Sequence, residues 1–148
     1  METAAEKGTL VVLAADLGTV DELVRLIHQV GAHVAALKTH VDMVEDFSPE
    51  NWQKVVEAAQ SHDLMLFEDR KFADIGNVSQ TQMGGVYDIR SWAELVTAHR
   101  VSGPDIIDGI AAGWDEVERI GGIFLLAQMS SRGNLLSDDY TAETIATG

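Results

Sequence analysis

Cysteine is absent from the 148-residue sequence, and so are long apolar runs. Without cysteine there is no disulfide bond and no thiolate metal site, and this composition is typical of proteins of the reducing cytosol. A membrane-spanning helix needs roughly 18 or more consecutive apolar residues, and no such run occurs. Residues 1–7 also lack the basic and apolar regions of a signal peptide. We therefore expect a cytoplasmic location and no membrane partner.

Positive charge is also scarce. Ten lysine and arginine residues stand against 24 aspartate and glutamate residues, which gives a formal net charge of -14 at pH 7. Such an excess repels the phosphate backbone of nucleic acids and anionic lipid surfaces, so neither is expected as a partner. An anionic small molecule would need local cations for its binding, and Lys38 and Lys71 are best placed to supply them.

Strands and helices are predicted to alternate along the chain. Apolar runs predict five strands, at residues 9–15, 33–37, 64–67, 93–98 and 123–127. This alternation favours an α/β fold with a parallel sheet, and the length favours one domain over residues 1–148.

Helix boundaries are marked by capping residues and glycines. Thr19, with Glu22 three residues later, forms a capping-box pattern, and Ser48 precedes Pro49 as an N-cap precedes a first-turn proline. Further helices are expected to end near residues 84–85 and to begin near residues 103–105 and at residue 138. The helix that begins near residue 103 is expected to break at Gly113 and to end at residues 121–122.

Three charged residues follow the third predicted strand: Asp69, Lys71 and Asp74. In parallel α/β proteins the carboxyl ends of the strands carry the chemistry. Asp69 and Lys71 are two residues apart, so on an extended chain they point to the same side. Nearby carboxylates favour the protonated form of a lysine, which makes Lys71 a positioned acid and a fixed positive charge. A solvated loop with a salt bridge is the alternative interpretation of these three residues.

Residues 67–77, FEDRKFADIGN, closely resemble the signature of the orotidine 5'-monophosphate decarboxylase family. Two further segments agree with that family in order and spacing: LKTHVD at residues 37–42, followed by DFS, and LAQMSSRGNL at residues 126–135, followed by DYT. The resemblance runs from about residue 10 to the C-terminus and is greatest to the form found in fungi and animals.

The resemblance implies loss of carbon dioxide from orotidine 5'-monophosphate to give uridine 5'-monophosphate, with no metal and no organic cofactor. By motif position Lys71 resembles the proton donor to the pyrimidine ring carbon. Asp69 resembles the carboxylate beside the departing carboxylate, and it also orients Lys71. Asp74 resembles the aspartate that reaches across the dimer interface. Lys38 would join this charged array and contact a ribose hydroxyl.

Two more residues are candidates for substrate binding by the same resemblance. Asp16, after the first strand, resembles the ribose-binding aspartate, and a cap of the first helix is the alternative. Ser130 resembles the serine that reads the pyrimidine edge, and a turn residue is the alternative. His40 and His99 lie at strand ends. They lack a clear carboxylate partner in the sequence, so we expect no metal there.

The resemblance implies a TIM barrel, which needs eight strands, whereas this sequence supplies about five βα units. An open sheet has two raw edges that favour association. We therefore expect a barrel that is incomplete in one chain or completed by oligomerisation, with a homodimer as the commonest solution. The family's phosphate-binding loops follow strands that are not among these five.

Val78 stands where the family has a threonine that contacts a ribose hydroxyl. Two alternatives to the family reaction also stay open, because the family's phosphate-binding loops follow strands that are not among the five predicted ones. One is a decarboxylase-like site for a different or unphosphorylated pyrimidine, and the other is a non-catalytic remnant or interaction protein.

Overall fold

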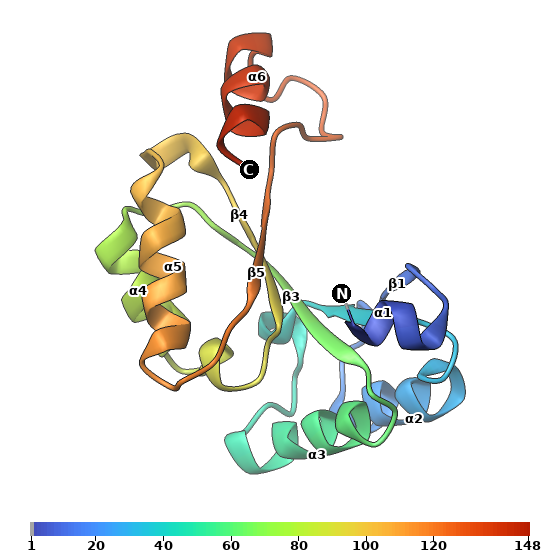
Figure 1. Ribbon diagram of the computed structural model, residues 1–148. Coiled ribbons are helices and arrows are strands. Elements are labelled where there is room, and N and C mark those ends of the chain that lie inside the picture. The colour runs from blue at the N-terminus through green and yellow to red at the C-terminus, as the bar shows by residue number, and fades with distance from the viewer. Residues whose placement is uncertain (1) are drawn as a thin grey trace. The chain divides into compact units, whose positions relative to one another are not determined.

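The computed structural model describes residues 2–148, in which strands and helices alternate (Figure 1). The strands are β1 (Val12–Ala14), β2 (Ala36–Thr39), β3 (Met65–Phe72), β4 (Leu95–Ala98) and β5 (Gly122–Leu125). The α-helices are α1 (Glu2–Lys7), α2 (Val20–Val30), α3 (Pro49–Gln60), α4 (Gly76–Met83), α5 (Asp105–Asp115) and α6 (Asp138–Thr147). Short 3-10 helices are η1 (Val41–Met43), η2 (Ile89–Ser91) and η3 (Arg100–Ser102).

The five strands form one sheet whose order is that of the chain, β1-β2-β3-β4-β5. β2 pairs in parallel with β1 and with β3, and the register places Ala36 opposite Val12 and Met65. The predicted α/β class with five parallel strands is therefore confirmed. β1 and β5 are the two ends of this order, so among the described residues the sheet is open. No helix in the described part of the chain combines the length and apolarity needed to cross a membrane.

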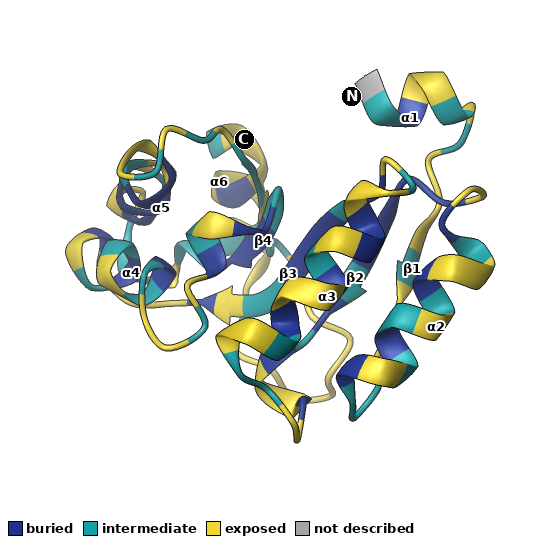
Figure 2. Cartoon of the chain, turned by 90° about the horizontal axis from the view of Figure 1, so that it is seen from below, coloured by how far each residue is buried: buried dark blue, intermediate teal, exposed yellow. Residues whose placement is uncertain are grey.

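Contacts between Cα atoms divide the chain into two compact units. The first contains the described residues up to Asp69, together with Trp92–Leu95, and the second contains Arg70–Ser91 and Val96–Gly148. In the first unit α2 and α3 lie beside the strands, with their buried faces toward them (Figure 2). The core of this unit includes Leu23, Ile27, Leu37, Trp52, Val55 and Leu66.

Both predicted helix starts in the first unit are confirmed. Thr19 is the N-cap of α2, where its Oγ1 accepts a hydrogen bond from the Glu22 backbone N–H at 3.4 Å. Ser48 is the N-cap of α3, accepts from the Asn51 N–H at 3.1 Å, and is followed by Pro49. Caps of this kind contribute about 1 kcal/mol each, because they satisfy donors that the first helical turn leaves unpaired.

In the second unit α4 and α5 lie side by side (Figure 1). A Cβ atom on Gly109 would overlap the backbone of Gly76, and one on Gly113 would lie 2.8 Å from Met83 Cβ. Glycine at these positions therefore serves helix packing. The predicted break at Gly113 is wrong, because α5 continues to Asp115, and the predicted end at residues 121–122 is wrong as well.

The third strand is longer than its apolar run. β3 extends from Met65 to Phe72, so the prediction that Asp69 and Lys71 lie beyond its end is wrong. Backbone pairing explains the extension, since Glu68 lies opposite Thr39 of β2 and the Phe72 carbonyl accepts from the His99 N–H at 2.7 Å.

Other elements also differ from the prediction. β4 begins at Leu95, two residues later than predicted, and β5 covers Gly122–Leu125 instead of 123–127. β2 begins and ends later than the run 33–37, β1 covers only three residues, and α1 was not predicted. Lys7, at the end of α1, donates through Nζ to the carbonyls of Gly31 at 2.6 Å and Val34 at 3.2 Å. Burial of its ammonium lowers the pKa of Lys7, and the nearby Asp63 carboxylate partly opposes this shift.

Candidate active site

Lys38 and Asp69 form an ion pair between neighbouring strands of the first unit. Lys38 lies on β2 and Asp69 on β3, and Lys38 Nζ is 2.8 Å from Asp69 Oδ2. Their side chains are only 20% and 15% exposed. Water and salt screen such a half-buried pair less than a surface pair, so each charge fixes the other more firmly.

Asp16 approaches this pair from the chain after β1. Its Oδ1 lies 3.9 Å from Lys38 Nζ, and its side chain is 53% exposed. The alternative interpretation of Asp16 as the cap of the first predicted helix is wrong, because Thr19 is the N-cap of α2. The structure therefore brings three of the predicted site residues together in one unit: Asp16, Lys38 and Asp69.

His40 belongs to the same group, although its sequence position suggested only a possible metal ligand. Its Nε2 lies 3.3 Å from Lys38 Nζ, 3.6 Å from Asp69 Oδ2 and 3.9 Å from Asp16 Oδ1. Alternation along an extended chain places Lys38 and His40 on one side, which is the signal that could have identified it. We call Asp16, Lys38, His40 and Asp69 the charged cluster.

Glu68 is a second residue that the sequence argument missed. Its side chain is fully buried, and its Oε2 accepts from Thr39 Oγ1 at 2.9 Å and from the Val41 N–H at 3.1 Å. The Val41 N–H also lies 3.3 Å from Oε1. Both carboxylate oxygens are thus hydrogen-bond acceptors within the first unit.

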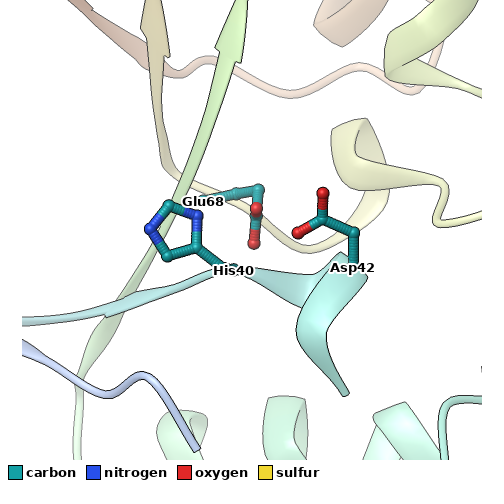
Figure 3. A group of neighbouring side chains, drawn as sticks. All are labelled: His40, Asp42 and Glu68. Carbon is teal, nitrogen blue, oxygen red and sulfur yellow. The ribbon is translucent and has the colours of Figure 1, made fainter. Parts of the chain in front are cut away.

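Figure 3 shows Glu68 between His40 and Asp42, and one potential ligand atom from each lies within 4.8 Å of the other two. An imidazole and two carboxylates are donors that divalent cations such as zinc accept. Here Glu68 already accepts hydrogen bonds from Thr39 and Val41, and the Lys38 ammonium lies beside His40. We therefore interpret the Glu68 carboxylate as a hydrogen-bond acceptor for Thr39 and Val41 rather than as a metal ligand.

Lys71 and Asp74 belong to the second unit, where both are exposed. They line a shallow pocket together with Arg70, Phe72, Ala73, Ile75, Gln82 and Ser102. Asp74 Oδ1 accepts from the Ile75 N–H at 2.8 Å, and its backbone carbonyl accepts from Ser102 Oγ at 2.8 Å. Asp74 is therefore held where the chain enters α4.

His99, at the end of β4, experiences the charge of Lys71. Burial of the imidazole lowers the pKa of His99, and the Lys71 ammonium lowers it further, because both disfavour a second positive charge. The neutral imidazole of His99 is thus favoured relative to an exposed histidine.

Ser130 lies in an exposed bend after β5. The surrounding loop is held by Thr141 Oγ1, which donates to the Ala127 carbonyl at 2.9 Å, and by Asn134 Nδ2, which donates to the Ser131 carbonyl at 2.8 Å. These contacts give the segment after β5 a defined course to α6.

Comparison with solved structures places the fold in the TIM-barrel class, with a sheet that is open among the described residues. Orotidine 5'-monophosphate decarboxylase from Methanocaldococcus jannaschii superposes with a TM-score of 0.75 at 16% identity, over 93% of this chain and 64% of that chain. The same enzyme complexed with the inhibitor BMP gives a TM-score of 0.73 at 16% identity, over 93% and 61%. At this identity the likeness establishes the fold alone.

Sequence comparison is more specific. Residues 9–147 match the model of the Orotidine 5'-phosphate decarboxylase / HUMPS family, and the chain belongs to that family. Orotidine 5'-phosphate decarboxylase of Rhizomucor pusillus is 43% identical over 97% of this chain, and that of Rhizopus oryzae is 41% identical over 98%. This chain covers 54% of each relative, so it spans about half the length of the curated relatives it matches.

Proposed function

We propose that the chain contributes the charged catalytic array for decarboxylation of orotidine 5'-monophosphate to uridine 5'-monophosphate. The observation that carries this proposal is the Lys38–Asp69 pair at 2.8 Å, with Lys71 two residues beyond Asp69 on β3. Family membership over residues 9–147 and relatives named for this activity support it. A pyrimidine nucleotide is therefore the proposed ligand.

The chemical difficulty is the carbanion that forms when the carboxylate leaves. The bond from the ring carbon to the carboxylate breaks, and its electron pair stays on the ring carbon. That pair then takes a proton from the Lys71 ammonium, which stabilises the developing negative charge before it gives up the proton. Lys71 is exposed, so its amine can regain a proton from water.

Asp69 supplies a fixed negative charge next to the substrate carboxylate. Repulsion between two carboxylates is relieved when carbon dioxide departs, so it raises the energy of the bound substrate more than that of the transition state. Lys38 holds Asp69 in place at 2.8 Å. In this proposal Lys38 and Asp16 also bind the ribose hydroxyls, and Ser130 reads the pyrimidine edge.

The assembly is part of the same proposal. Residues 1–148 are proposed to form one partial TIM-barrel domain, and Asp74 is proposed to complete the array of a partner subunit in a cytoplasmic homodimer. The open order of the strands supports association, because an unpaired strand edge favours pairing with another chain. Sedimentation of the purified chain, with and without BMP, measures the oligomeric state.

A site for a different or unphosphorylated pyrimidine is the second candidate function. Val78 supports a ligand that differs at the ribose, because valine at this position of α4 lacks the hydroxyl with which the family's threonine contacts a ribose hydroxyl. Comparing the affinities of orotidine and its 5'-monophosphate separates the two candidates. A non-catalytic remnant would bind neither compound.

Replacing Lys71 with alanine tests the proposal. We expect turnover, followed by the loss of ultraviolet absorbance of orotidine 5'-monophosphate, to fall by about 10²- to 10⁴-fold, because the general acid is lost. Lys54→Ala is the matched control: Lys54 is exposed on α3, where its Nζ donates to Asn51 Oδ1 at 2.8 Å. Equal turnover in wild type and a folded Lys71→Ala variant would exclude the assigned role.

A further inference from the structure

A carboxylate buried in the first unit has no part in the proposed reaction. The Glu68 side chain is fully inaccessible to solvent, whereas Asp69, next to it on β3, is partly exposed. Burying a carboxylate costs several kcal/mol unless hydrogen bonds or opposite charges compensate it. An apolar residue would fill this core position without that cost, so Glu68 calls for a role beyond filling space.

Glu68 contacts β2 directly beside the charged cluster, but on the other face of the strands. The register of β2 and β3 places Thr39 directly opposite Glu68. Side chains alternate along a strand, so Thr39 and Glu68 lie on the face of the strands opposite to Lys38 and Asp69. The 2.9 Å hydrogen bond from Thr39 to Glu68 thus lies one residue from the 2.8 Å pair of Lys38 and Asp69.

Glu68 also holds the segment that follows β2. The Val41 N–H donates to its carboxylate at 3.1 Å, and Val41 is the first residue of η1. His40, the residue before η1, offers no side-chain cap there, so Glu68 takes the place of a capping side chain. The residues on either side of His40 therefore both donate hydrogen bonds to the Glu68 carboxylate: Thr39 through its hydroxyl and Val41 through its backbone N–H. These two bonds fix the backbone at His40.

We propose that Glu68 is a positioning residue for the active site. Its hydrogen bonds with Thr39 and Val41 hold the end of β2 in place beside β3. These hydrogen bonds keep Lys38 at hydrogen-bond distance from Asp69 and hold His40 beside them. The structural part of the inference rests on contacts within the first unit alone. Its kinetic consequence rests on the proposed decarboxylase function.

Two variants each remove a different part of this arrangement, and a third restores one of them. Glu68→Gln keeps the size of the side chain but removes its charge and leaves one oxygen acceptor. Thr39→Val removes the hydroxyl donor, and Thr39→Ser restores it. Glu57→Gln is the matched control, because Glu57 is exposed on α3, where its Oε1 accepts from Gln53 Nε2 at 3.2 Å.

The first measurement is independent of catalysis. The chain has four lysines, so the surroundings of Lys38 can be followed through the chemical shift of its ¹³C-labelled Cε atom at a fixed pH. We expect the chemical shift of the Lys38 signal to move in Glu68→Gln and Thr39→Val, and to return in Thr39→Ser. The Lys54 signal is expected to stay unchanged. An unchanged Lys38 signal in folded Glu68→Gln would overturn the inference, even if the chain proved to be inactive.

The second measurement is the kinetics of the active protein, in the assembly in which it turns over. We expect kcat for orotidine 5'-monophosphate to fall about 10- to 100-fold in Glu68→Gln with a smaller change in KM, because the reacting groups are misplaced rather than removed. In a Lys38→Ala background, Glu68→Gln is expected to lower kcat much less, because Glu68 is proposed to act by positioning Lys38. Equal losses in both backgrounds would show a general structural role and contradict the proposal.

Discussion

The two units hold their candidate catalytic residues in different ways. In the first unit Lys38 and Asp69 are half-buried, lie 2.8 Å apart and stand next to a buried hydrogen-bonded carboxylate. In the second unit Lys71 and Asp74 are exposed along a shallow pocket. Charges fixed in advance lower a barrier without reorganisation during the reaction, whereas a proton donor must exchange with water. The first unit is therefore suited to preorganised charge and the second to proton delivery.

Removing the Lys38 ammonium from the charged cluster is expected to have the largest effect on activity. Lys38→Met leaves Asp69 without its 2.8 Å partner, so we expect turnover to fall by about 10²- to 10³-fold. The loss of a partly buried ion-pair partner is expected to cost about 1–3 kcal/mol of unfolding free energy. Kinetics and urea unfolding of the same variant measure both effects. Wild-type turnover in Lys38→Met would remove Lys38 from the site.

Overfilling the contact between α4 and α5 tests the packing of the second unit. In Gly109→Ala the new methyl group meets the backbone of Gly76, which cannot move aside as a flexible side chain would. We expect a loss of about 1–3 kcal/mol in urea unfolding. Gly18→Ala in the first unit is the control, because its Cβ would have only Glu45 Oε1 nearby, at 3.9 Å. Equal stability of the two variants would contradict the close packing.

The smallest expected effect is that of His99 on the pH dependence of the unfolding free energy. Burial, followed by the charge of Lys71, lowers the pKa of His99 in the folded protein below its ordinary value of 6.5. Below pH 6.5 the unfolded chain therefore binds more protons at this residue, and the unfolding free energy decreases as the pH falls. His99→Gln should flatten this decrease, and Lys71→Ala should reduce it. An identical pH dependence of stability in wild type and His99→Gln would contradict the pKa shift.

Features that depend on neighbouring residues in the chain could be predicted from the sequence. The starts of α2 and α3 follow from Thr19 and from Ser48 with Pro49, because an N-cap acts within one helical turn. Lys38 and Asp69 were predicted as site residues because each lies in a distinctive motif, and the structure brings their side chains together.

Features that depend on pairing between distant segments could not be predicted. The apolar run of β3 ends at Phe67, but the strand continues to Phe72. Glu68 pairs with Thr39 of β2, and the Phe72 carbonyl accepts from the His99 N–H. Gly113 reads as a helix break until Met83 is known to pack against it. The contacts of Glu68 with Thr39 and Val41 depend on the pairing of β2 and β3, because nothing local links residues 39 and 41 to residue 68.

The most direct test of the central claim is decarboxylation of orotidine 5'-monophosphate by wild type and by Asp69→Asn. Asparagine keeps the shape of the side chain and removes the charge that Lys38 holds in place. The proposed array predicts measurable turnover in wild type, a loss of about 100-fold or more in Asp69→Asn, and an unchanged fold by circular dichroism. Equal rates in the two proteins, or a folded wild type that binds the nucleotide without turning it over, would contradict the assignment of the charged cluster as a decarboxylase site.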